Sequence, residues 1–580
     1  MIETAAASTT RTTWTPRRSP AVATGGMVAA KMPAAVDAGL AMLEKGGNAI
    51  DAAVAAAFAV GVAEPWMNGL GGGGFLVAWL AKEQRSVVIE YPMLSPAAAT
   101  PEMFPLANGG ATDTFLFGWP ATVDSANVIG PRAVAVPGTV AGLALALERY
   151  GTRSLAEVLE PAIVIAEEGF PVTWHTTLTI AKDLANIRRF PETARTFLTA
   201  SGVPPVTTEQ LNPTIIRQPE LAATLRALAD QGPRAFYEGE IAETIAAHLA
   251  ANGSAMAVDD LRAYQATETA SLTVNLHGHR VHTVGGPSGG TSLAQALTML
   301  NQVDLAASGH NTAETLHTMT HVFRQVFADR FAWLADPDHV DVPFDALLDP
   351  AYAAECLARL DPERALTPRA GDRIRLGVTH AMPPSVPEYV RDGSTTHLGA
   401  VDAEGNAVSL TQTLLAGFGS RVTIPGTGVL MNNGMMWFDP EPGRPNSVAG
   451  RKRPLSNMAP ALVTRDSELL ASVGSSGGRR IQNCNAQIIT NLVDFGMSAQ
   501  EAIDAPRIDT STRLLAVSAR IDPAVRERLA EVGHAVSPRD EALMTSDFAS
   551  PVVVRREPEG ALDGGVDPWY FPASAGGLMG

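Results

Sequence analysis

The sequence predicts a mixed α/β protein with a large buried core, and three observations support this fold class. Of its 580 residues, 46% are hydrophobic and only 18% are charged, a composition typical of compact globular proteins. From about residue 137 to residue 385, apolar residues recur with the spacing of helices. After about residue 394 they alternate as they do in strands, so the last third should be rich in strand.

The first part of the chain begins with a Thr-, Ala- and Arg-rich stretch, residues 1–25, which we expect to be a flexible lead. Two helices should follow at residues 33–45 and 49–62, with Asn48 as the N-cap of the second. A glycine run, residues 69–74, precedes a predicted strand at residues 75–80. Further along, the pattern predicts a strand at residues 279–284 and helices at residues 155–168, 240–252 and 313–334.

The last third opens with two predicted strands in residues 395–414, joined by the turn Ala403-Glu404-Gly405-Asn406. The composition changes just before them, at a polar turn in residues 391–394. A later helix should begin near Asn485. More strands are predicted at residues 428–431, 461–464, 468–473 and 551–555.

The net charge of −17 at neutral pH disfavours nucleic acid and anionic membranes as partners. The apolar stretch at residues 52–63 is too short to span a bilayer. Residues 1–20 lack the apolar segment of a secretory signal, so we expect a cytoplasmic protein. Its two cysteines, Cys356 and Cys484, exclude a disulfide framework.

The stretch Asp392-Gly393-Ser394-Thr395-Thr396-His397 lies at the composition boundary. A threonine hydroxyl is a poor nucleophile at neutral pH unless a base lies beside it. Cleavage of the Ser394–Thr395 bond would supply that base as the free α-amine of Thr395, at the first position of a strand. On spacing alone, two threonines that open a strand are ordinary β-formers, so the pattern leaves both interpretations open.

A glycine-rich turn, Gly474-Ser475-Ser476-Gly477-Gly478, follows a predicted strand and precedes a predicted helix. Its successive amides could form an oxyanion hole; the alternative is a tight turn without a catalytic role. This turn and Gly286-Pro287-Ser288-Gly289-Gly290 both match the G-x-S-x-G pattern of a nucleophile elbow. An α/β-hydrolase is therefore a rival hypothesis, although no later histidine has surroundings that complete its triad.

Two other patterns favour structural roles. The glycine run at residues 69–74 lacks the lysine of a phosphate-binding loop, so we expect close backbone packing there. His317 and His321 stand four residues apart on a predicted helix, a spacing that suits a metal, but the sequence offers no evident third ligand. We therefore expect neither a metal nor a cofactor.

Taken together and in order, ten segments resemble the γ-glutamyltranspeptidase family. The similarity covers roughly residues 25 to 570, and on this collinearity we set the α/β-hydrolase hypothesis aside. The segments are Gly47-Asn48-Ala49-Ile50-Asp51-Ala52-Ala53-Val54, Gly69-Leu70-Gly71-Gly72-Gly73-Gly74-Phe75, Val136-Pro137-Gly138-Thr139-Val140-Ala141-Gly142, Pro287-Ser288-Gly289-Gly290, Ala328-Asp329-Arg330, Asp336-Pro337-Asp338, Thr395-Thr396-His397, Leu430-Met431-Asn432-Asn433, Lys452-Arg453-Pro454-Leu455-Ser456 and Gly477-Gly478.

The resemblance implies an N-terminal-nucleophile hydrolase with a four-layer αββα sandwich. It also implies a precursor that cleaves itself between Ser394 and Thr395. The large fragment, residues 26–394 behind the lead, and the small fragment, residues 395–580, would then form one catalytic domain as a heterodimer, whether or not it dimerises further. Thr395 matches the nucleophile and its α-amine the general base. Thr413 matches the threonine that binds the nucleophile's hydroxyl, and Gly477 and Gly478 match the oxyanion-hole glycines.

The family's substrate contacts do not carry over. Pro92 stands where the family has the arginine that binds the substrate α-carboxylate, and Trp437 stands where an aspartate binds the α-amino group. Leu415 replaces an asparagine and Gly434 a glutamine. Because both charge-assisted partners of a zwitterionic head group are missing, we expect weak or no γ-glutamyl transfer.

Besides Trp437, four residues remain as candidates for substrate binding: Asn433, Ser456, Asn457 and Arg479. Asn457 replaces the second of two serines that are paired in the family, and Arg479 stands where a serine is usual. Arg479 either binds a substrate carboxylate or is a structural or surface arginine.

The sequence thus predicts a hydrolase that forms an acyl-enzyme ester with a small, non-γ-glutamyl acyl substrate. The bond cleaved would be an amide or an activated C–C bond, an oxalyl or other 2-oxo acid group would fit, and antibiotic biosynthesis is a suitable setting. The alternatives are a true γ-glutamyl hydrolase or transpeptidase acting on glutathione-like substrates, a cephalosporin-acylase-like amidase, and a non-catalytic binding protein on the same fold.

Overall fold

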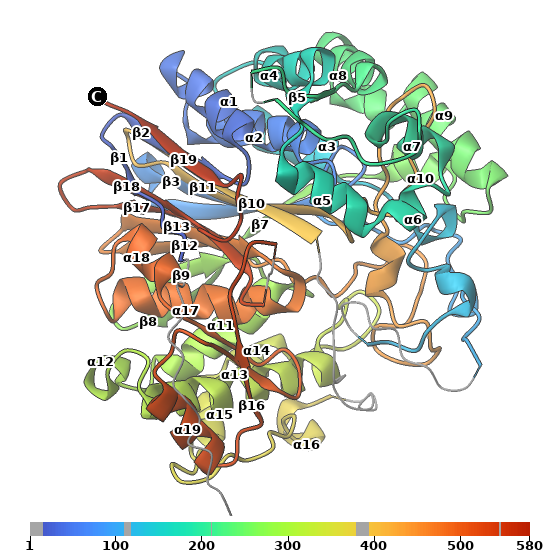
Figure 1. Ribbon diagram of the computed structural model, residues 1–580. Coiled ribbons are helices and arrows are strands. Elements are labelled where there is room, and N and C mark those ends of the chain that lie inside the picture. The colour runs from blue at the N-terminus through green and yellow to red at the C-terminus, as the bar shows by residue number, and fades with distance from the viewer. Residues whose placement is uncertain (1–14, 109–117, 210, 379–393, 545–546) are drawn as a thin grey trace, which may run out of the picture.

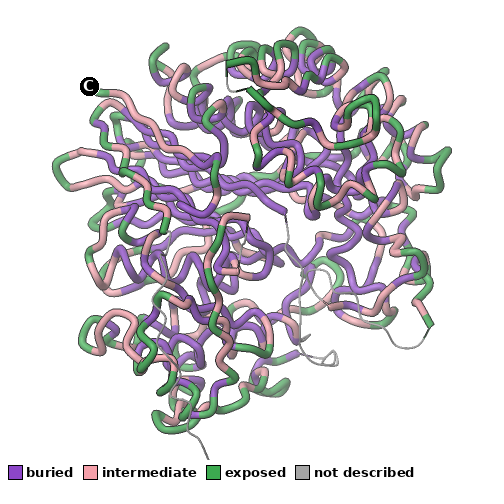
Figure 2. The backbone as a smooth tube through the Cα atoms, viewed as in Figure 1, coloured by how far each residue is buried: buried purple, intermediate pink, exposed green. Residues whose placement is uncertain are grey.

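The computed structural model describes residues 15–108, 118–209, 211–378, 394–544 and 547–580. Two seven-stranded sheets lie against each other in the middle of the molecule, and helices cover the outer face of each sheet (Figure 1). Buried backbone is concentrated in these sheets and in the helices beside them (Figure 2). The predicted four-layer αββα sandwich is confirmed.

The sheet that contains Thr395, called sheet I below, is antiparallel throughout. Its strand order is β19-β2-β10-β11-β3-β4-β7. The strands are β19 (Ser574–Leu578), β2 (Gly26–Ala30), β10 (Ser394–Asp402), β11 (Ala407–Leu415), β3 (Gly73–Leu80), β4 (Arg85–Tyr91) and β7 (Thr267–Ala270).

The second sheet, called sheet II, is also antiparallel. Its strand order is β1-β18-β17-β13-β12-β9-β8. The strands are β1 (Ala21–Ala23), β18 (Leu562–Val566), β17 (Ser550–Arg556), β13 (Glu468–Ser476), β12 (Ala461–Arg465), β9 (His279–Thr283) and β8 (Leu272–Leu276).

Three apolar layers hold the sandwich together, because each sheet is buried on both faces. Alternate residues of β10 point in opposite directions: Leu398 and Ala400 pack under the helices of sheet I, whereas Val401 packs against sheet II. The helices over sheet I are α1 (Pro33–Glu44), α2 (Ala49–Ala63), α3 (Thr139–Tyr150), α4 (Leu155–Glu168) and α8 (Pro219–Gln231). Those over sheet II are α11 (Gly289–Leu300), α13 (Ala313–Trp333), α17 (Ile481–Val493) and α18 (Ala499–Asp504).

Shorter elements surround this framework. The remaining helices are α5 (Trp174–Lys182), α6 (Leu184–Ile187), α7 (Pro191–Phe197), α9 (Gly239–Ala251), α10 (Val258–Ala263), α12 (Leu305–Ser308), α14 (Phe344–Leu348), α15 (Pro350–Leu357), α16 (Arg373–Leu376) and α19 (Pro523–Glu531). Two small sheets are built from β5 (Phe170–Pro171) with β6 (Ile215–Ile216), and from β14 (Ile508–Asp509), β15 (Leu515–Ser518) and β16 (Val536–Arg539).

Helix α2 shows how the sequence builds the layer behind Thr395. Asn48 caps it as predicted, because its side-chain oxygen accepts hydrogen bonds from the backbone N–H groups of Ile50 and Asp51. Asp51 completes a capping box and also accepts from the backbone N–H of Thr152 at 2.8 Å. The helix is rich in alanine and buried on almost every side, so it packs closely on sheet I and ends at Glu64.

Most of the predicted elements are confirmed, with small shifts at their ends. The helix predicted at residues 155–168 is α4 and that at 313–334 is α13, while residues 395–414 form the predicted hairpin of β10 and β11. The polar turn predicted in residues 391–394 lies outside the described residues, except for Ser394.

Three expectations need correction. Residues 21–23, assigned to a flexible lead, form β1 and pair with β18 at the edge of sheet II. Residues 428–431 form no strand, since Leu430 and Met431 make only isolated bridges to Thr423 and Gly71. Helix α17 begins at Ile481, before the predicted start near Asn485. For β1 the reason is its partner β18, near the other end of the chain, which a local pattern does not reveal.

Both sheets mix strands from the two sides of the Ser394–Thr395 bond. In sheet I, β10 lies between β2 and β11, and β11 lies between β10 and β3. In sheet II, β12 of the C-terminal part pairs with β9 of the N-terminal part. The backbone hydrogen bonds of both sheets would therefore hold two fragments together after cleavage at this bond.

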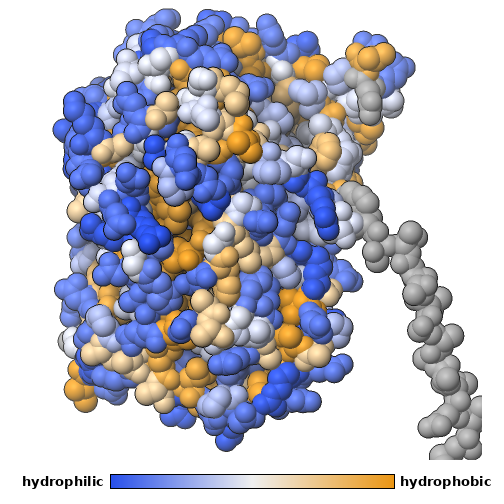
Figure 3. All heavy atoms as spheres, turned by 90° about the vertical axis from the view of Figure 1, so that its left-hand side faces the viewer, coloured by the Kyte–Doolittle hydropathy of each residue, from blue (hydrophilic) through white to orange (hydrophobic). Residues whose placement is uncertain are grey.

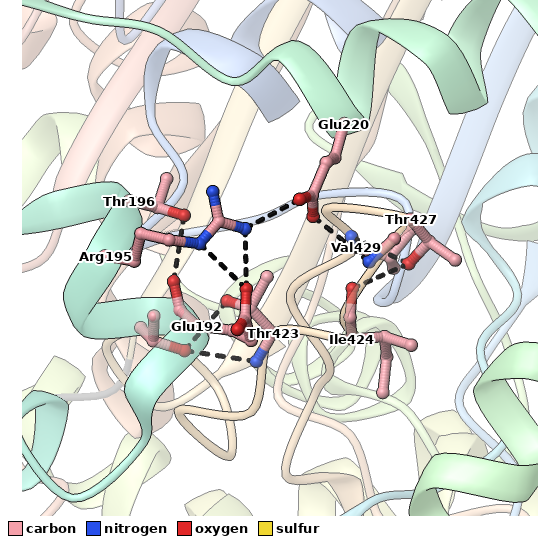
Figure 4. Close-up of polar contacts among 10 residues, drawn as sticks. Glu192, Arg195, Thr196, Glu220, Thr423, Ile424, Thr427 and Val429 are labelled. Atoms are coloured by element: carbon pink, nitrogen blue, oxygen red, sulfur yellow. Dashed lines mark hydrogen bonds and ion pairs between the residues drawn. The ribbon is translucent and has the colours of Figure 1, made fainter.

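Side chains reinforce the same association around residues 421–429, as Figure 4 shows. Arg195 of α7 binds both Glu192 and Glu220, at 2.6 and 2.7 Å, and the carboxylate of Glu220 accepts a hydrogen bond from the backbone N–H of Gly426. The buried Thr193 hydroxyl donates to the carbonyl of Arg421 at 2.7 Å. Two helices of the N-terminal part thus fix the loop that follows β11.

The face in Figure 3 is largely hydrophilic, with apolar residues reaching it in several separate patches. Within the described ranges, no helix combines the length and the apolar character needed to cross a bilayer. Cys356 and Cys484 are buried free thiols.

A buried histidine cluster predicts acid sensitivity. His317 Nδ1 lies 2.7 Å from His534 Nε2, and Arg324 lies 3.3 Å from the other ring nitrogen of His534. Burial, then the charge of Arg324, lowers the pKa of His534 to about 3. Because an unfolded histidine titrates near about 6.5, the folded state should lose stability as the pH falls from about 6.5 towards 3.

We expect His534→Asn to make the thermal unfolding temperature depend less on pH between 7.5 and 5. The exposed His339→Asn is the matched control and should leave the slope as in the wild type. Equal slopes for His534→Asn and the wild type would contradict the prediction.

Candidate active site

Thr395 lies at the start of β10, with its side chain in the buried space between the two sheets. Its hydroxyl donates a hydrogen bond to the carbonyl oxygen of Ser394 at 2.6 Å and lies 3.3 Å from the hydroxyl oxygen of Thr413. The Thr413 hydroxyl also donates to the Ser394 carbonyl. The carbonyl of the predicted scissile bond is therefore held between two hydroxyl groups.

An irregularity in the pairing of β10 with β11 creates this arrangement. Ser394 pairs with Leu415 and Thr396 pairs with Gln412, so Thr413 and Leu414 together stand opposite Thr395. Such a bulge redirects side chains and is frequent beside active sites. Here it brings the Thr413 hydroxyl onto the Ser394 carbonyl, where the backbone N–H of Leu415 donates to the same hydroxyl at 2.7 Å.

The chain that follows β11 is held in uncommon backbone conformations. Leu415, Phe418 and Arg421 have φ angles of 87°, 57° and 66°, a left-handed region that costs non-glycine residues free energy. Hydrogen bonds impose these conformations: the N–H of Phe418 donates to the carbonyl of Trp66 and that of Ala416 to the side chain of Asn433. The bulge thus belongs to a locally strained and tightly bonded segment.

The segment after α2 binds the residue before the scissile bond and also the opposite strand β11. The Ser394 hydroxyl donates to the carbonyl of Trp66 at 2.6 Å, and the N–H of Leu414 donates to the carbonyl of Met67 at 2.9 Å. Ser394 and Leu414 are thereby fixed to the same loop. This loop connects α2 to the glycine run, so the N-terminal part of the chain positions the residue before Thr395.

The glycine run at residues 69–74 allows close backbone contact, as predicted. A Cβ atom at Gly72 would collide with the carbonyl oxygen of Thr413, and one at Gly71 with that of Leu430. Only residues without a side chain let β3 and its approach lie this near to β11. The run therefore serves to place Thr413.

The two sheets meet in a regular register on the face that carries Thr395. A Cβ at Gly399 would lie 3.0 Å from the hydroxyl of Ser472, and one at Gly474 would overlap the ring of His397. Continued by one step, this alternation predicts that Thr395 lies opposite Ser476, the residue before Gly477 and Gly478. The two glycines have φ angles of 145° and 61° and lead into the short helix Gly478–Arg480.

Asn432 and the predicted Asn433 both bind backbone. Asn432 donates to the carbonyls of Gly71 and Ala135. The Asn433 amide accepts from Ala416 and donates to the carbonyl of Val128 at 2.9 Å. Through these two hydrogen bonds the Asn433 side chain holds the loop after β11 in place.

The positions expected to meet a charged head group are apolar and enclosed. Trp437 is 2% exposed and belongs to the same buried cluster as Met93, Leu415 and Met436. The carbonyl of Pro92 accepts a hydrogen bond from the Tyr264 hydroxyl at 2.7 Å. Neither position can supply the charge that a zwitterion requires.

Arg330 holds Ser456 and Asn457 in place. Its guanidinium donates to the carbonyl of Ser456 and to the side-chain oxygen of Asn457, at 2.6 and 3.0 Å, and to the carbonyl of Ser288 at 2.9 Å. The Ser288 hydroxyl donates to the carbonyl of Val284 and accepts from the N–H of Gly290, so it caps α11. These contacts give Ser288 a scaffold role.

Arg479 is buried, which excludes the surface alternative. Its guanidinium lies 4.5 Å from the ring centre of Phe331 and 5.5 Å from that of Phe327. Burial lowers its pKa to about 9, so it stays charged at neutral pH. A cation therefore follows the Gly477-Gly478 turn directly, beside two aromatic rings.

Three groups near Thr396 were not singled out from the sequence: the buried Lys31 and Glu64 and the half-buried Tyr570. The Tyr570 hydroxyl donates to Glu64, and Lys31 Nζ donates to the carbonyl of Ser550 at 2.8 Å. Burial raises the pKa of Glu64 to about 7 and lowers that of Lys31 to about 8. The available signal was a charged residue at the end of a wholly apolar segment, which occurs both at Lys31 and at Glu64.

The architecture defines the class of protein. Two stacked antiparallel sheets between helical layers, with a threonine hydroxyl at the start of a central strand, form the fold of the N-terminal-nucleophile hydrolases. The crystal structure of cephalosporin acylase from Bacillus halodurans superimposes with a TM-score of 0.84 at 26% identity, over 99% of this chain and 100% of that one. Helicobacter pylori γ-glutamyltranspeptidase gives a TM-score of 0.53 at 31% identity, over 58% of this chain and 91% of that one.

The chain belongs to the γ-glutamyltranspeptidase family, whose model matches residues 35–576. It is 37% identical over 560 residues to an acylase ACY 1 proenzyme of Pseudomonas sp. (strain V22), covering 95% of this chain and 93% of that protein. It is 34% identical over 503 residues to the glutathione hydrolase proenzyme of Escherichia coli (strain K12), covering 84% and 81%. Proteins of this family are hydrolases or transferases that are processed into two subunits.

The contact between Gly474 and His397 generates a test of the register between the sheets. Gly474→Ala should destabilise the protein by about 1–3 kcal/mol, because the new methyl group overlaps the buried imidazole. Gly417→Ala is the control, since a Cβ there meets nothing within 4 Å. Thermal unfolding measures both, and a Gly474→Ala protein as stable as Gly417→Ala would show the register to be wrong.

Proposed function

We propose that the protein is a precursor that cleaves its own Ser394–Thr395 bond and then uses Thr395 to hydrolyse an acyl substrate. The observation that carries this proposal is the Ser394 carbonyl, which accepts hydrogen bonds from the hydroxyls of both Thr395 and Thr413. Hydrogen bonds to a carbonyl oxygen stabilise the negative charge that develops there during attack.

Self-cleavage follows from this geometry in two steps. The Thr395 oxygen attacks the carbonyl carbon of Ser394, its proton passes to the Thr395 nitrogen, and the peptide C–N bond breaks to leave an ester. Water then hydrolyses the ester, which releases the carboxylate of Ser394 and restores the Thr395 hydroxyl. The fragments are residues 1–394 and 395–580.

Turnover uses the groups that cleavage releases. The free α-amine of Thr395 accepts the hydroxyl proton as the oxygen attacks the substrate carbonyl. The amides of Gly477 and Gly478 face the tetrahedral oxyanion, and Thr413 orients the nucleophile. The leaving amine departs with that proton, and water completes the cycle by hydrolysing the acyl ester.

The pocket favours an acyl group without the γ-glutamyl zwitterion. Pro92 and the buried Trp437 provide neither the cation nor the anion that such a head group needs. Arg479 offers one cation beside the Gly477-Gly478 turn, which suits a substrate carboxylate such as that of an oxalyl or glutaryl group. Ser456, Asn457 and Asn433 shape the wall around it.

Amide hydrolysis is the reaction we favour over C–C cleavage. The acylase relative is similar over 95% of this chain, and an amine is a leaving group that the α-amine can protonate directly. Glutathione hydrolysis is the second candidate, on the strength of the Escherichia coli relative. Trp437 and Pro92 count against it.

Intact mass measurement tests the first half of the proposal. Wild-type protein should separate into two fragments that divide between Ser394 and Thr395, and Thr395→Ala should remain one chain. Thr413→Val should cleave roughly ten to a hundred times more slowly, because it keeps the shape and loses the hydroxyl. The control Thr298→Val, in α11, should cleave at the wild-type rate. If the wild-type protein stays whole, the proposal is refuted, and a non-catalytic binding protein on this fold becomes the remaining interpretation.

A panel of p-nitroanilides tests the substrate class. Glutaryl and oxalyl anilides should be hydrolysed faster than γ-glutamyl-p-nitroanilide, as followed by release of p-nitroaniline. Arg479→Met should raise the KM for these acidic anilides at least tenfold more than for the acetyl anilide, because only the former carry a carboxylate. Robust turnover of γ-glutamyl-p-nitroanilide by the wild type would refute the argument from Pro92 and Trp437.

A further inference from the structure

A chain of buried polar groups lies beside the start of β10, and the proposed reaction does not use it. Lys31 Nζ donates to the carbonyl and the hydroxyl of Ser550, and it lies 4.6 Å from the ring centre of Tyr570. The Tyr570 hydroxyl donates to Glu64. Lys31 and Glu64 have no exposed surface. A fully buried ammonium is costly unless the structure uses its charge.

The strand register places Lys31 on the same face as Thr395. Ala29 of β2 pairs with Gly399 of β10, so two further residues bring Lys31 beside His397. Residues opposite each other in an antiparallel pair share a face, and the contact of Lys31 with Ser550 of sheet II confirms that it points between the sheets. Thr395 precedes His397 by two residues and points the same way.

The Lys31 ammonium lies near the start of the glycine turn. Ser550 pairs with Ser476 across β17 and β13. The neighbouring Ala549 packs against Gly477, where a Cβ would lie only 2.7 Å from the Ala549 Cβ. The ammonium therefore lies in the space between the sheets that is bounded by β10 on one side and by the start of the Gly477-Gly478 turn on the other.

We propose that the positive charge of Lys31 acts through space on the α-amine of Thr395 and keeps that amine in its neutral, proton-accepting form. Glu64 and Tyr570 position the lysine. The inference rests on the proposed function, because the amine exists only after cleavage at Thr395. Lys31 is thus a positioning residue that tunes the general base and touches no reacting atom.

The physical basis is the mutual repulsion of two cations in a desolvated space. A free α-amino group ordinarily titrates at about 7.7–8.0, so without help much of it would be protonated at neutral pH. A unit charge about 8–10 Å away in a protein interior lowers such a pKa by about one unit. His397 already responds to this charge: burial, and then Lys31, lowers its pKa to about 3.

Most of the other titratable groups that face Lys31 are neutral at neutral pH. His175 of α5 and His397 of β10 are neutral, since burial lowers the pKa of both, and Cys484 and Tyr570 are neutral because burial raises theirs. Two acids oppose the lysine. Asp567 also faces Arg18. Glu64 lies beside the Thr396 hydroxyl, on the α2 side of sheet I, and its pKa is raised to about 7.

The pH dependence of acylation tests the inference. p-Nitrophenyl acetate serves as an acyl donor that needs little recognition, and the burst of p-nitrophenolate is timed from pH 5 to 9. Intact mass of the small fragment checks that Thr395 is the acetylated residue. In Lys31→Met the acidic limb of the rate profile should move up by about one pH unit, because the amine no longer has a neighbouring cation. Lys31→Arg should restore the wild-type limb.

Two further variants make the test specific. Lys452 is a matched buried lysine, with its pKa also lowered to about 8, bonded to the carbonyls of Pro445 and Ser447; Lys452→Met should leave the limb in place. Glu64→Gln keeps a partner for Tyr570 but removes an acid that is partly ionised near pH 7, so it should move the limb down, by less than Lys31→Met moves it up. This opposite shift carries the test if Lys31→Met does not fold.

The outcomes separate the two proposals. An uncut wild type, or a Thr395→Ala protein that still cleaves, overturns the proposed function and this inference with it. Cleaved Lys31→Met and Glu64→Gln proteins whose acidic limbs stay at the wild-type pH overturn only the inference. The inference alone is also overturned if the acidic limb moves equally in Lys31→Met and in Lys452→Met.

Discussion

The site depends on one constraint, which is that β11 carries an extra residue opposite Thr395. With regular pairing, the Thr413 hydroxyl would not reach the carbonyl of Ser394, and Leu415 would not need a φ angle of 87°. The glycine run and the loop after α2 maintain this irregularity from one side. Asn433 maintains it from the other through the N–H of Ala416. The conformational strain is therefore distributed among contacts from several parts of the chain.

The same contacts explain why a cleaved chain would remain one catalytic unit. Each sheet pairs strands from before Thr395 with strands from after it, so separation would expose buried strand edges and break backbone hydrogen bonds in both sheets. The helices α7 and α8 add side-chain contacts to the loop after β11. Two such fragments would depend on each other for the geometry around Thr395 as well as for stability.

The charges around Thr395 are arranged unlike those expected for γ-glutamyl recognition. Pro92 and Trp437, where the head-group contacts of the family are expected, are apolar, and Arg479 is a buried cation. Near the start of β10, Lys31 and Glu64 form a second buried charged group. Such groups are expensive to bury unless they are bonded or used.

Local pattern determined much of this protein. The helices α2, α4 and α13 and the hairpin of β10 and β11 follow from periodicity and caps, because those elements satisfy their own hydrogen bonds locally or with an adjacent strand. The order of the motifs indicated the family and placed Thr395 and Thr413. Only the tertiary structure decided that residues 21–23 join sheet II, that residues 428–431 form a bridge rather than a strand, and that Lys31, Glu64 and Tyr570 meet beside Thr396. Most of these contacts join residues that are far apart in the sequence, and a local sequence pattern does not show which distant residues meet.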